Sequence, residues 1–371
     1  MNNTISVRSC REYDPEAVLE LIAGIYEKTG GPDVMGKKVL LKPNILSDND
    51  PSRCVSTHPV VVEAMIRYLK SRGADVYAGD SPAVHRKGFR PEKSGIAAAC
   101  EAAGASWVDF LVNPVERKVG KRTIKITGII DSVDIIISLP KLKNHELMYF
   151  TGAIKNTLGL VPGFSKAMQH GIYRDRNRFG EFLVDLCEAV TPDYFLMDGI
   201  MGMEGPGPGP KGVPVNTGVL LGSTNPLIVD MIASEIAGYR PLVIPTTKTA
   251  YFRKKWLSSV EDIVYDGPEI STLVNENFRK IPVSGNSTAG LRFVLGRTLA
   301  GRRLERRPVF LRDKCTGCRK CVDICPADAI IQDPSDRRHI ILTDSKCIRC
   351  YCCAEACTDD AIDVRIKLFG V

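Results

Sequence analysis

Two stretches of the chain carry the same cysteine pattern: CTGCRKCVDICP at residues 315–326 and CIRCYCCAEACT at residues 347–358. In both stretches the cysteines are spaced C-x2-C-x2-C-x3-C. This spacing is typical of chains that bind two [4Fe–4S] clusters, where the fourth cysteine of each run is a ligand of the other cluster. The pattern therefore predicts two [4Fe–4S] clusters and an exchange of single electrons.

Crossed ligation divides the eight cysteines into two sets. The predicted ligands are Cys315, Cys318, Cys321 and Cys357 for the first cluster, and Cys347, Cys350, Cys353 and Cys325 for the second. Two zinc sites built on C-x2-C pairs are the alternative, but they leave Cys321 and Cys353 without a role. The second run also has an extra thiol, Cys352, which is either a bystander or a substitute ligand. Thr358 stands where the first run has Pro326.

The two cysteine runs belong to a longer internal repeat. An offset of 32 residues aligns Lys314 with Lys346, and the sequence Asp-Ala-Ile at 328–330 with that at 360–362. Such a repeat predicts a pseudo-two-fold module of about 55 residues, which is too small to fold on a hydrophobic core alone. We therefore expect a small α+β domain at residues 309–371 that resembles a bacterial ferredoxin and is held together by its clusters.

Arginines are concentrated just before this module. The segment 284–308 is predicted to be a linker, and the basic residues in and beside it are Arg292, Arg297, Arg302, Arg303, Arg306, Arg307 and Arg312, against only Glu305. A solvated linker and a docking surface for an acidic electron-donor protein such as ferredoxin are both compatible with this charge. Nucleic-acid binding is not expected, because no aromatic residues are interleaved with the arginines.

The overall charge and hydropathy set further expectations. The formal net charge of +7 falls to about +3 when two clusters are bound, because each oxidised four-thiolate cluster carries about −2. No stretch approaches 18 consecutive apolar residues, so we expect no membrane contact. The N-terminal residues include no apolar segment of the kind that secretory signals carry, and the expected location is therefore cytoplasmic.

Residues 1–283 are predicted to form an α/β domain. Short apolar runs typical of buried parallel strands occur at 38–41, 75–78, 135–139, 194–197 and 219–221. Segments with helical periodicity lie at 58–72, 92–103, 179–190 and 226–237. The alternation favours a mostly parallel sheet with flanking helices.

Polar residues follow each predicted strand. The tails read KPN at 42–44, GDSP at 79–82, PKLKNH at 140–145, DG at 198–199 and GSTN at 222–225. Because the carboxyl ends of parallel strands meet along one edge of a sheet, these tails predict a binding site there. Two glycine-rich loops, at 151–159 and 202–212, add Lys155, Asn156 and Glu204 to this edge. The second loop is expected to be neither helix nor central strand.

Several of these stretches resemble a known family. The sequences KPN (42–44), STHP (56–59), GDSP (79–82), LPKLKNH (139–145), TGAIKNTLGLVPG (151–163) and DGIMGMEGPGPG (198–209) are similar to the family called domain of unknown function 362. Its members often carry a C-terminal ferredoxin module. The resemblance implies the two-part architecture and marks the residues of the sheet edge, but it implies no substrate.

The residue types at the sheet edge favour an anionic ligand, because lysines stabilise carboxylates and phosphates where water is partly excluded. The predicted catalytic residues are Lys42, Asp80, Lys141, His145, Lys155 and Asp198, and the predicted substrate contacts are Asn44, Ser81, Lys143, Asn156 and Glu204. His145 is a candidate proton donor, with a purely structural role equally open. Cys54 beside Arg53 is a candidate reactive thiol.

Together, these features predict an iron–sulfur oxidoreductase. It would pass low-potential electrons through two [4Fe–4S] clusters to an anionic small molecule, or to a bound flavin or corrinoid, on the α/β domain. The alternatives are a non-catalytic electron-transfer or redox-sensing adaptor and a cluster-handling accessory protein.

Overall fold

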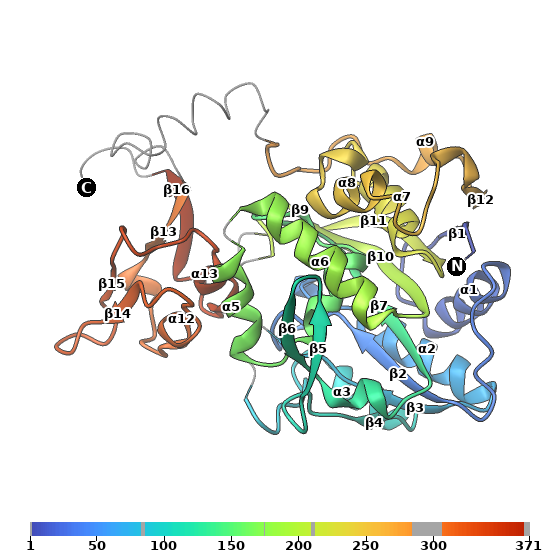
Figure 1. Ribbon diagram of the computed structural model, residues 1–371, viewed down its shortest axis with the longest axis horizontal. Helices are drawn as coiled ribbons and strands as arrows, with labels where there is room; N and C mark the ends of the chain where they lie inside the picture. The colour runs from blue at the N-terminus through green and yellow to red at the C-terminus, as the bar shows by residue number, and fades with distance from the viewer. Residues whose placement is uncertain (1, 83–85, 174, 209–211, 284–305, 367–371) are drawn as a thin grey trace.

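The computed structural model describes residues 2–82, 86–173, 175–208, 212–283 and 306–366 (Figure 1). Most of the predicted arginine-rich linker, residues 284–305, lies outside the described residues. The last three residues assigned to it, Arg306 to Pro308, are part of a strand. Among the described residues, no helix has both the length and the apolar character that crossing a bilayer requires.

The larger part of the chain is built on one mixed, mostly parallel sheet. Its strand order is β12-β1-β11-β10-β7-β2-β3-β4, and the strands β10, β7, β2, β3 and β4 run parallel to one another. The bounds are β1 (Thr4–Ser9), β2 (Lys38–Pro43), β3 (Asp75–Ala78), β4 (Ser106–Trp107), β7 (Ile135–Leu139), β10 (Tyr194–Glu204), β11 (Val213–Ser223) and β12 (Val264–Asp266). The predicted α/β class is confirmed. The antiparallel strands β1 and β11 are an addition to it.

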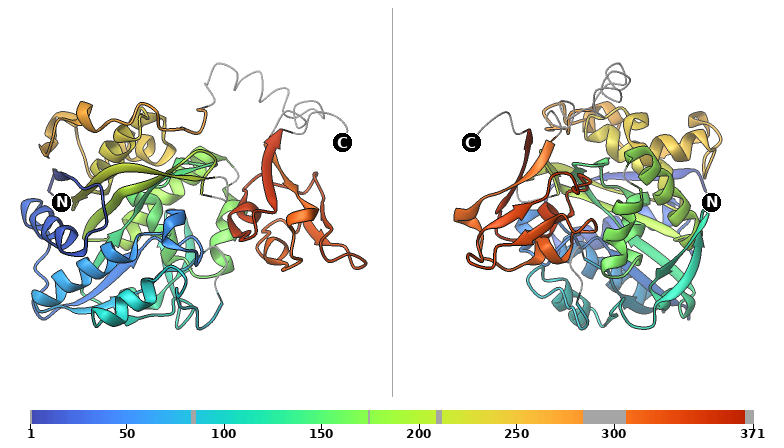
Figure 2. Two further views of the ribbon diagram at one scale, coloured as in Figure 1. Left: turned by 180° about the vertical axis from the view of Figure 1, so that it is seen from behind. Right: turned by 60° about the vertical axis from the view of Figure 1, so that its left-hand side comes forward.

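Helices cover both faces of this sheet (Figures 1 and 2). One core packs α1 (Pro15–Lys28), α2 (Pro59–Ser71) and α3 (Ile96–Ala102) against Val39 and Leu41 of β2. The other packs α6 (Arg176–Val190) and α7 (Pro226–Ile236), with α8 (Pro245–Phe252), against Leu40 of the same strand. Because successive side chains of a strand point to opposite faces, the apolar residues of β2 are buried alternately in one core and in the other.

The long hairpin of β10 and β11 corrects one expectation. Residues 202–204 of the predicted loop 202–212 continue β10, where Gly202 pairs with Val215 and Glu204 with Val213. The register shifts between Gly199 and Met201, and this bulge lets the strand bend and continue past the sheet edge. The loop expectation is therefore wrong for residues 202–204, whereas residues 205–208 and 212 lie outside both strands, as expected of a loop.

Smaller elements surround the carboxyl edge of the sheet. β8 (Lys141–His145) pairs with β10 and with the short β9 (Tyr149–Phe150). The helices α4 (Ala153–Asn156) and α5 (Phe164–Ile172) follow it. The remaining elements are the hairpin of β5 (Val115–Val119) and β6 (Arg122–Ile126), and α9 (Ile270–Leu273).

Within the described residues 306–366, the C-terminal part has two short antiparallel sheets and two short α-helices. The sheets pair β13 (Arg306–Phe310) with β16 (Ile362–Ile366), and β14 (Ile330–Gln332) with β15 (Ile340–Leu342); the helices are α12 (Lys320–Asp323) and α13 (Cys352–Ala356). Positive φ angles recur at the 32-residue offset in the pairs Gly317 and Arg349, Arg319 and Tyr351, and Asp328 and Asp360. The backbone therefore repeats as the sequence does.

The C-terminal part lies against α5 of the larger part (Figure 2). Ala167 of α5 packs with Ile324 and Cys352 in a small apolar cluster. Beside it, the guanidinium of Arg306 lies 2.7 Å from the Glu146 carboxylate. These contacts bring α13 to the carboxyl edge of the main sheet.

Candidate functional site

The cysteines gather in the two crossed sets that the spacing predicts. A cavity of about 310 Å³ is lined by four of them: Cys325, Cys347, Cys350 and Cys353. Burial first, and then the neighbouring Cys318, Cys357 and Cys315, raise the pKa of Cys321 to about 12. Cys321 and Cys353, which the zinc alternative leaves without a role, both belong to these sets. The donor sets therefore fit two clusters better than two zinc ions.

Cys352 lies beside the cluster cavity. It is 5% exposed and belongs to the apolar contact with α5, and the described residues that line the cavity do not include it. Its thiol is in contact with that of Cys350, which does line the cavity. The bystander and the substitute-ligand interpretations of the extra thiol both stay predictions.

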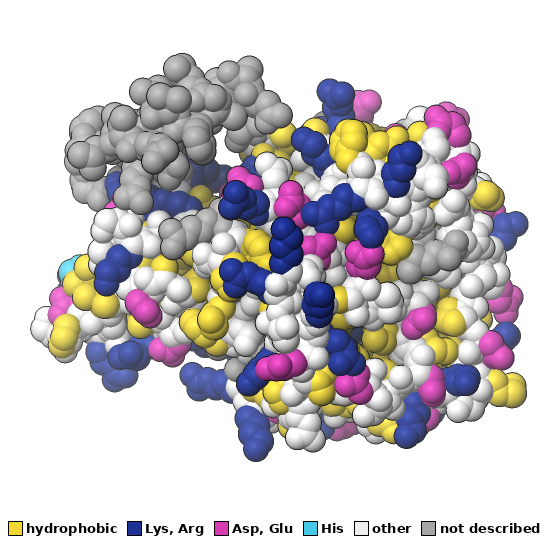
Figure 3. Space-filling model, viewed as in Figure 1, with side chains coloured by type: hydrophobic (Ala, Val, Ile, Leu, Met, Phe, Trp, Pro, Cys, Tyr) yellow, Lys and Arg dark blue, Asp and Glu magenta, His cyan; other side chains and the backbone are white. Residues whose placement is uncertain are grey.

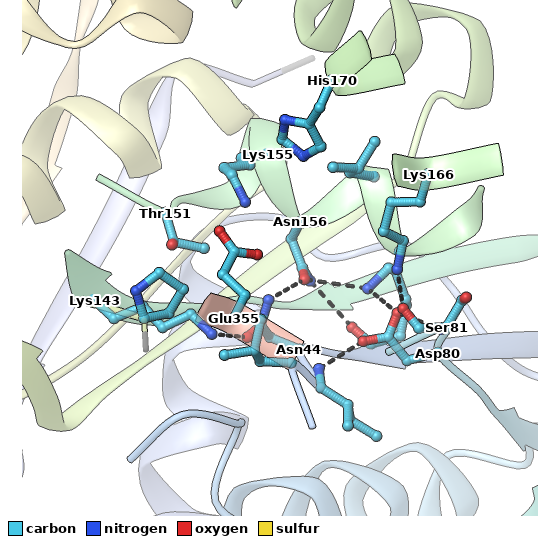
Figure 4. A pocket seen from close by; sticks show the side chains of 16 residues that line it. Asn44, Asp80, Ser81, Lys143, Thr151, Lys155, Asn156, Lys166, His170 and Glu355 are labelled. Atoms are coloured by element: carbon cyan, nitrogen blue, oxygen red, sulfur yellow. Dashed lines mark hydrogen bonds and ion pairs between the residues drawn. The ribbon is translucent and has the colours of Figure 1, made fainter. Parts of the chain in front are cut away.

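A polar pocket lies where the edge of the main sheet meets the C-terminal part (Figure 4). It holds about 500 Å³ of empty space. Its polar lining comes from the end of β2 (Lys42, Asn44), the end of β3 (Asp80, Ser81), β8 (Lys143), the β9–α4 segment (Thr151, Lys155, Asn156), α5 (Lys166, His170) and α13 (Glu355). Seven of the eleven predicted site residues are in this set.

At the base of the pocket, Lys42 and Asp80 form a buried ion pair. Their charged atoms are 2.9 Å apart, and the side chains are 1% and 2% exposed. The Lys42 ammonium also donates to the side-chain oxygen of Asn156, while Asp80 accepts from the backbone N–H of Ile45 and of Ser81. Burial lowers the pKa of Lys42, and Asp80 opposes this effect.

Gly159 allows the pair to sit this deep. A Cβ at this position would lie 2.0 Å from Oδ1 of Asp80 and 2.4 Å from Nζ of Lys42, so a larger residue would displace the pair.

The α4 helix, which carries Lys155 and Asn156, is held at its N-terminal end by Asp230, which accepts hydrogen bonds from the N–H groups of Ala153 and Ile154. Burial raises the pKa of Asp230 to about 7, against these two hydrogen bonds.

Three further lysines face the pocket with different partners. Lys143 donates to the Asn44 side chain at 2.6 Å and to the Val55 carbonyl, and Lys166 donates to the Ser81 carbonyl. Lys155 makes no hydrogen bond or ion pair with any residue that the structure describes. Burial lowers the pKa of all three, that of Lys166 to about 8.

Lys141 and Asp198 form a second buried pair, which the pocket lining does not include among the described residues. Their charged atoms are 2.6 Å apart. The Tyr13 hydroxyl lies within 3.0 Å of both, and the His58 backbone N–H donates to Asp198 at 2.9 Å. The residues expected in a single site therefore fall into two separate groups, and only the group with Lys42 and Asp80 lines the pocket. The physical reason is that β8 shifts register against β10 between Lys141 and Lys143, so the two lysines reach different surroundings.

The expected roles of Glu204 as a substrate contact and of Cys54 as a reactive thiol are not supported by the contacts and burial of these residues. Glu204 is outside the described pocket lining and pairs with Arg279, whose Nε lies 2.5 Å away. Burial raises the pKa of the Cys54 thiol, although Lys141 opposes the effect, so the reactive thiolate is disfavoured.

His145 is a neutral donor rather than a titrating acid. Burial lowers its pKa to about 4, with Lys155 adding to the effect and Glu355 opposing it. Its Nδ1 accepts from the backbone N–H groups of Leu147 and Met148, both at 3.2 Å. The proton of the neutral ring therefore lies on Nε2, which faces Glu355 at 3.2 Å.

Sequence reasoning missed four pocket residues: Thr151, Lys166, His170 and Glu355. The spacing of Lys166 and His170, four residues apart on one helix face, was a usable signal. Glu355 gave no signal, because it stands between two cluster cysteines.

Comparison with known proteins gives the family. Residues 39–235 match the model of the domain of unknown function DUF362, and residues 307–358 match that of a 4Fe-4S dicluster domain. The chain therefore belongs to the DUF362 family and carries a C-terminal dicluster domain. Both expectations drawn from the sequence are confirmed.

Two individual proteins are similar to the chain. The "Thylakoid-associated protein sll1697" of Synechocystis sp. is 33% identical over 251 residues, which cover 66% of this chain and 78% of that protein. The lactate racemase apoprotein from Thermoanaerobacterium thermosaccharolyticum superimposes with a TM-score of 0.43 at 12% identity, over 62% of this chain and only 56% of that one. The second likeness supports no functional argument, and the cytoplasmic location stays a prediction.

Proposed function

We propose that the protein is an iron–sulfur oxidoreductase, which passes low-potential electrons to an anionic acceptor in the pocket between its two parts. The observation that carries the proposal is the position of Glu355. It stands between Cys353 and Cys357 in the chain, yet its side chain lines the same pocket as Lys42 and Lys155. When bound, the two [4Fe–4S] clusters would supply electrons one at a time.

The charge of the pocket supports an anionic acceptor. Lys42, Lys143, Lys155 and Lys166 face two carboxylates, those of Asp80 and Glu355. Burying charge without a partner is costly, so the surplus of lysines favours an anion in the remaining space. The same lysines would stabilise negative charge that develops on the acceptor as it is reduced.

The space available favours a small acceptor. The empty volume of about 500 Å³ includes the open solvent at the mouth of the pocket, so the enclosed part can receive only a small group, such as a carboxylate or a phosphate of the acceptor. A carboxylated or phosphorylated compound is the proposed acceptor, and a flavin or corrinoid bound through an anionic group is the variant of this proposal. Asn44, Asn156 and Ser81 would orient it with their hydrogen-bonding groups.

The proposed electron donor is a separate acidic protein such as reduced ferredoxin. Basic side chains are exposed on the C-terminal part of the molecule (Figure 3). Arg312, Lys314 and Arg319 are all more than half exposed and lie near the first cysteine run, although each also contacts a carboxylate of its own part. This surface supports docking beside the first cluster site.

The test begins with anaerobic reconstitution of the full chain. The proposal expects about eight iron atoms per chain and clusters that reduced ferredoxin can reduce. Reduced protein is then mixed with pools of carboxylated and phosphorylated metabolites, and cluster reoxidation is followed by electron paramagnetic resonance. Reoxidation by a compound in the parent protein, and not in Lys42→Met, would support the proposal. Clusters that no compound reoxidises, and that transfer intact to an apo acceptor, would favour the accessory-protein alternative.

A further inference from the structure

Glu355 is an unusual residue of the pocket because it comes from the cluster-binding part. Its side chain is 13% exposed, and its carboxylate lies 3.2 Å from the His145 ring of β8. Within the pocket, the Glu355 side chain lies beside Lys155 and Thr151 (Figure 4). Lys155 and His170 line the same pocket as this carboxylate. The Glu355 carboxylate is thus surrounded by basic groups that prefer an anion.

These groups are incompletely satisfied by Glu355. The Nε2 of His145 lies 3.2 Å from the carboxylate, within ion-pair distance, but the N–H is not aligned well enough to count as a hydrogen bond. The Thr151 hydroxyl, on a side chain that is 2% exposed, has no hydrogen-bond partner within the described part of the chain. The half-buried Lys155 also makes no hydrogen bond or ion pair with the described residues, so its ammonium is free to bind a ligand. Buried donors without partners are rare, and they indicate a ligand that is better placed than the present one.

The donors are also held in place independently of Glu355. Two backbone N–H groups fix the His145 ring through Nδ1, so Nε2 stays a donor whether or not Glu355 is present. Asp230 fixes the start of α4, and with it the position of Lys155. The site is therefore preorganised for an oxygen anion.

We propose that His145 and Lys155, with the Thr151 hydroxyl, form a carboxylate-binding subsite, which the side chain of Glu355 occupies until a carboxylate of the ligand displaces it. This inference rests on the proposed function, since it names the chemical class of the acceptor. A carboxylate is favoured over a phosphate because the present occupant is one. In addition, one neutral donor and one cation match a single negative charge.

The test measures binding of acetate and sulfate to the reconstituted full-length protein by titration calorimetry at pH 7.5. Glu355→Gln removes the tethered competitor, whose effective concentration is in the millimolar range or above. We therefore expect acetate to bind at least about tenfold more tightly than to the parent, with a smaller gain for sulfate. An iron content of about eight atoms per chain shows that each variant is folded.

Two further variants separate displacement from a general change in charge. Glu355→Asp keeps the charge but draws it back from His145 by one methylene group, so it should also tighten acetate binding. Glu146→Gln removes a carboxylate from the same junction, where it pairs with Arg306, and should leave acetate affinity unchanged. A gain for sulfate in Glu355→Gln that equals or exceeds the gain for acetate would reveal a general field effect and overturn the subsite.

The outcomes also distinguish this inference from the proposed function. If acetate binds no more tightly to Glu355→Gln and Glu355→Asp than to the parent, while sulfate binds to the parent, the subsite is refuted and the anion pocket stands. If neither anion binds to any variant, the anion pocket on which the proposed function depends is refuted as well.

Discussion

The two buried lysine–carboxylate pairs at the sheet edge look alike but have different surroundings. Lys42–Asp80 lies at the base of the pocket, beside Lys155, which has no partner in the described structure. Lys141–Asp198 is enclosed by the Tyr13 hydroxyl and the His58 backbone, which satisfy the remaining hydrogen-bonding capacity. A buried ion pair is therefore not in itself the mark of a site. Unsatisfied donors next to a cavity are the better indicator.

The largest expected effect comes from a substitution that places an extra atom against the Lys42–Asp80 pair. Gly159→Ala places a methyl group 2.0 Å from Asp80 and 2.4 Å from Lys42, so the pair must separate. We expect the free energy of unfolding to fall by about 3–5 kcal/mol, as for other broken buried pairs, and sulfate binding to be lost. Urea denaturation and calorimetric titration measure the two effects.

Gly24→Ala is the matched control for this substitution. Gly24 lies within α1, and nothing stands within 4 Å of a Cβ built there. Alanine favours a helix over glycine by about 1 kcal/mol, so this variant should be as stable as the parent or more so. If Gly159→Ala behaved in the same way, the close approach at the first pair would be wrong.

Replacing the lysine of each pair separates stability from binding. Lys42→Met and Lys141→Met each leave a buried carboxylate without its cation, and each should destabilise the fold by about 3 kcal/mol or more. Only Lys42→Met should also abolish sulfate binding in the folded protein, because Lys141 does not line the pocket in the described structure. Equal loss of sulfate affinity in the two variants would show that they belong to one site.

The pH dependence of sulfate binding tests whether Lys166 contributes to the pocket that contains the Lys42–Asp80 pair. Burial lowers the pKa of Lys166 to about 8, with Asp80 opposing and Lys42 reinforcing the shift. The ammonium is charged below that pH and loses its proton above it. Sulfate affinity should therefore hold at pH 7 and fall as the pH rises through 8, by up to tenfold per unit.

Titration of the Lys166→Met variant checks the origin of this pH dependence. Its sulfate affinity should be lower than that of the parent at pH 7, and the inflection near pH 8 should be lost. Any slope that remains would come from Lys42, Lys143 and Lys155, whose pKa values burial also lowers. Sulfate itself does not titrate in this range, so an inflection near pH 8 that survives the substitution would have to come from another group.

The surroundings of the Lys42–Asp80 pair could be predicted from the sequence to a greater extent than those of the Lys141–Asp198 pair. Lys42, Asp80 and Asn156 were assigned to one edge because parallel strands end together, and the structure brings them together. The separation of Lys141 depends on a register irregularity in β8, which no local pattern encodes. Glu355 was out of reach for another reason. Its place in the pocket depends on how the C-terminal part docks against α5, a tertiary contact between segments far apart in the chain.

The smallest expected effect concerns the second pair. The His58 ring stacks on Tyr13 with centroids 3.5 Å apart, and its Nδ1 accepts the Val60 N–H at the start of α2. In His58→Asn the amide can still cap the helix, and the backbone N–H can still donate to Asp198. Only the ring stacking is lost, so unfolding should become easier by about 0.5–1.5 kcal/mol. Sulfate affinity should not change. A drop in sulfate affinity, at full iron content, would mean that the surroundings of the Lys141–Asp198 pair influence binding in the pocket.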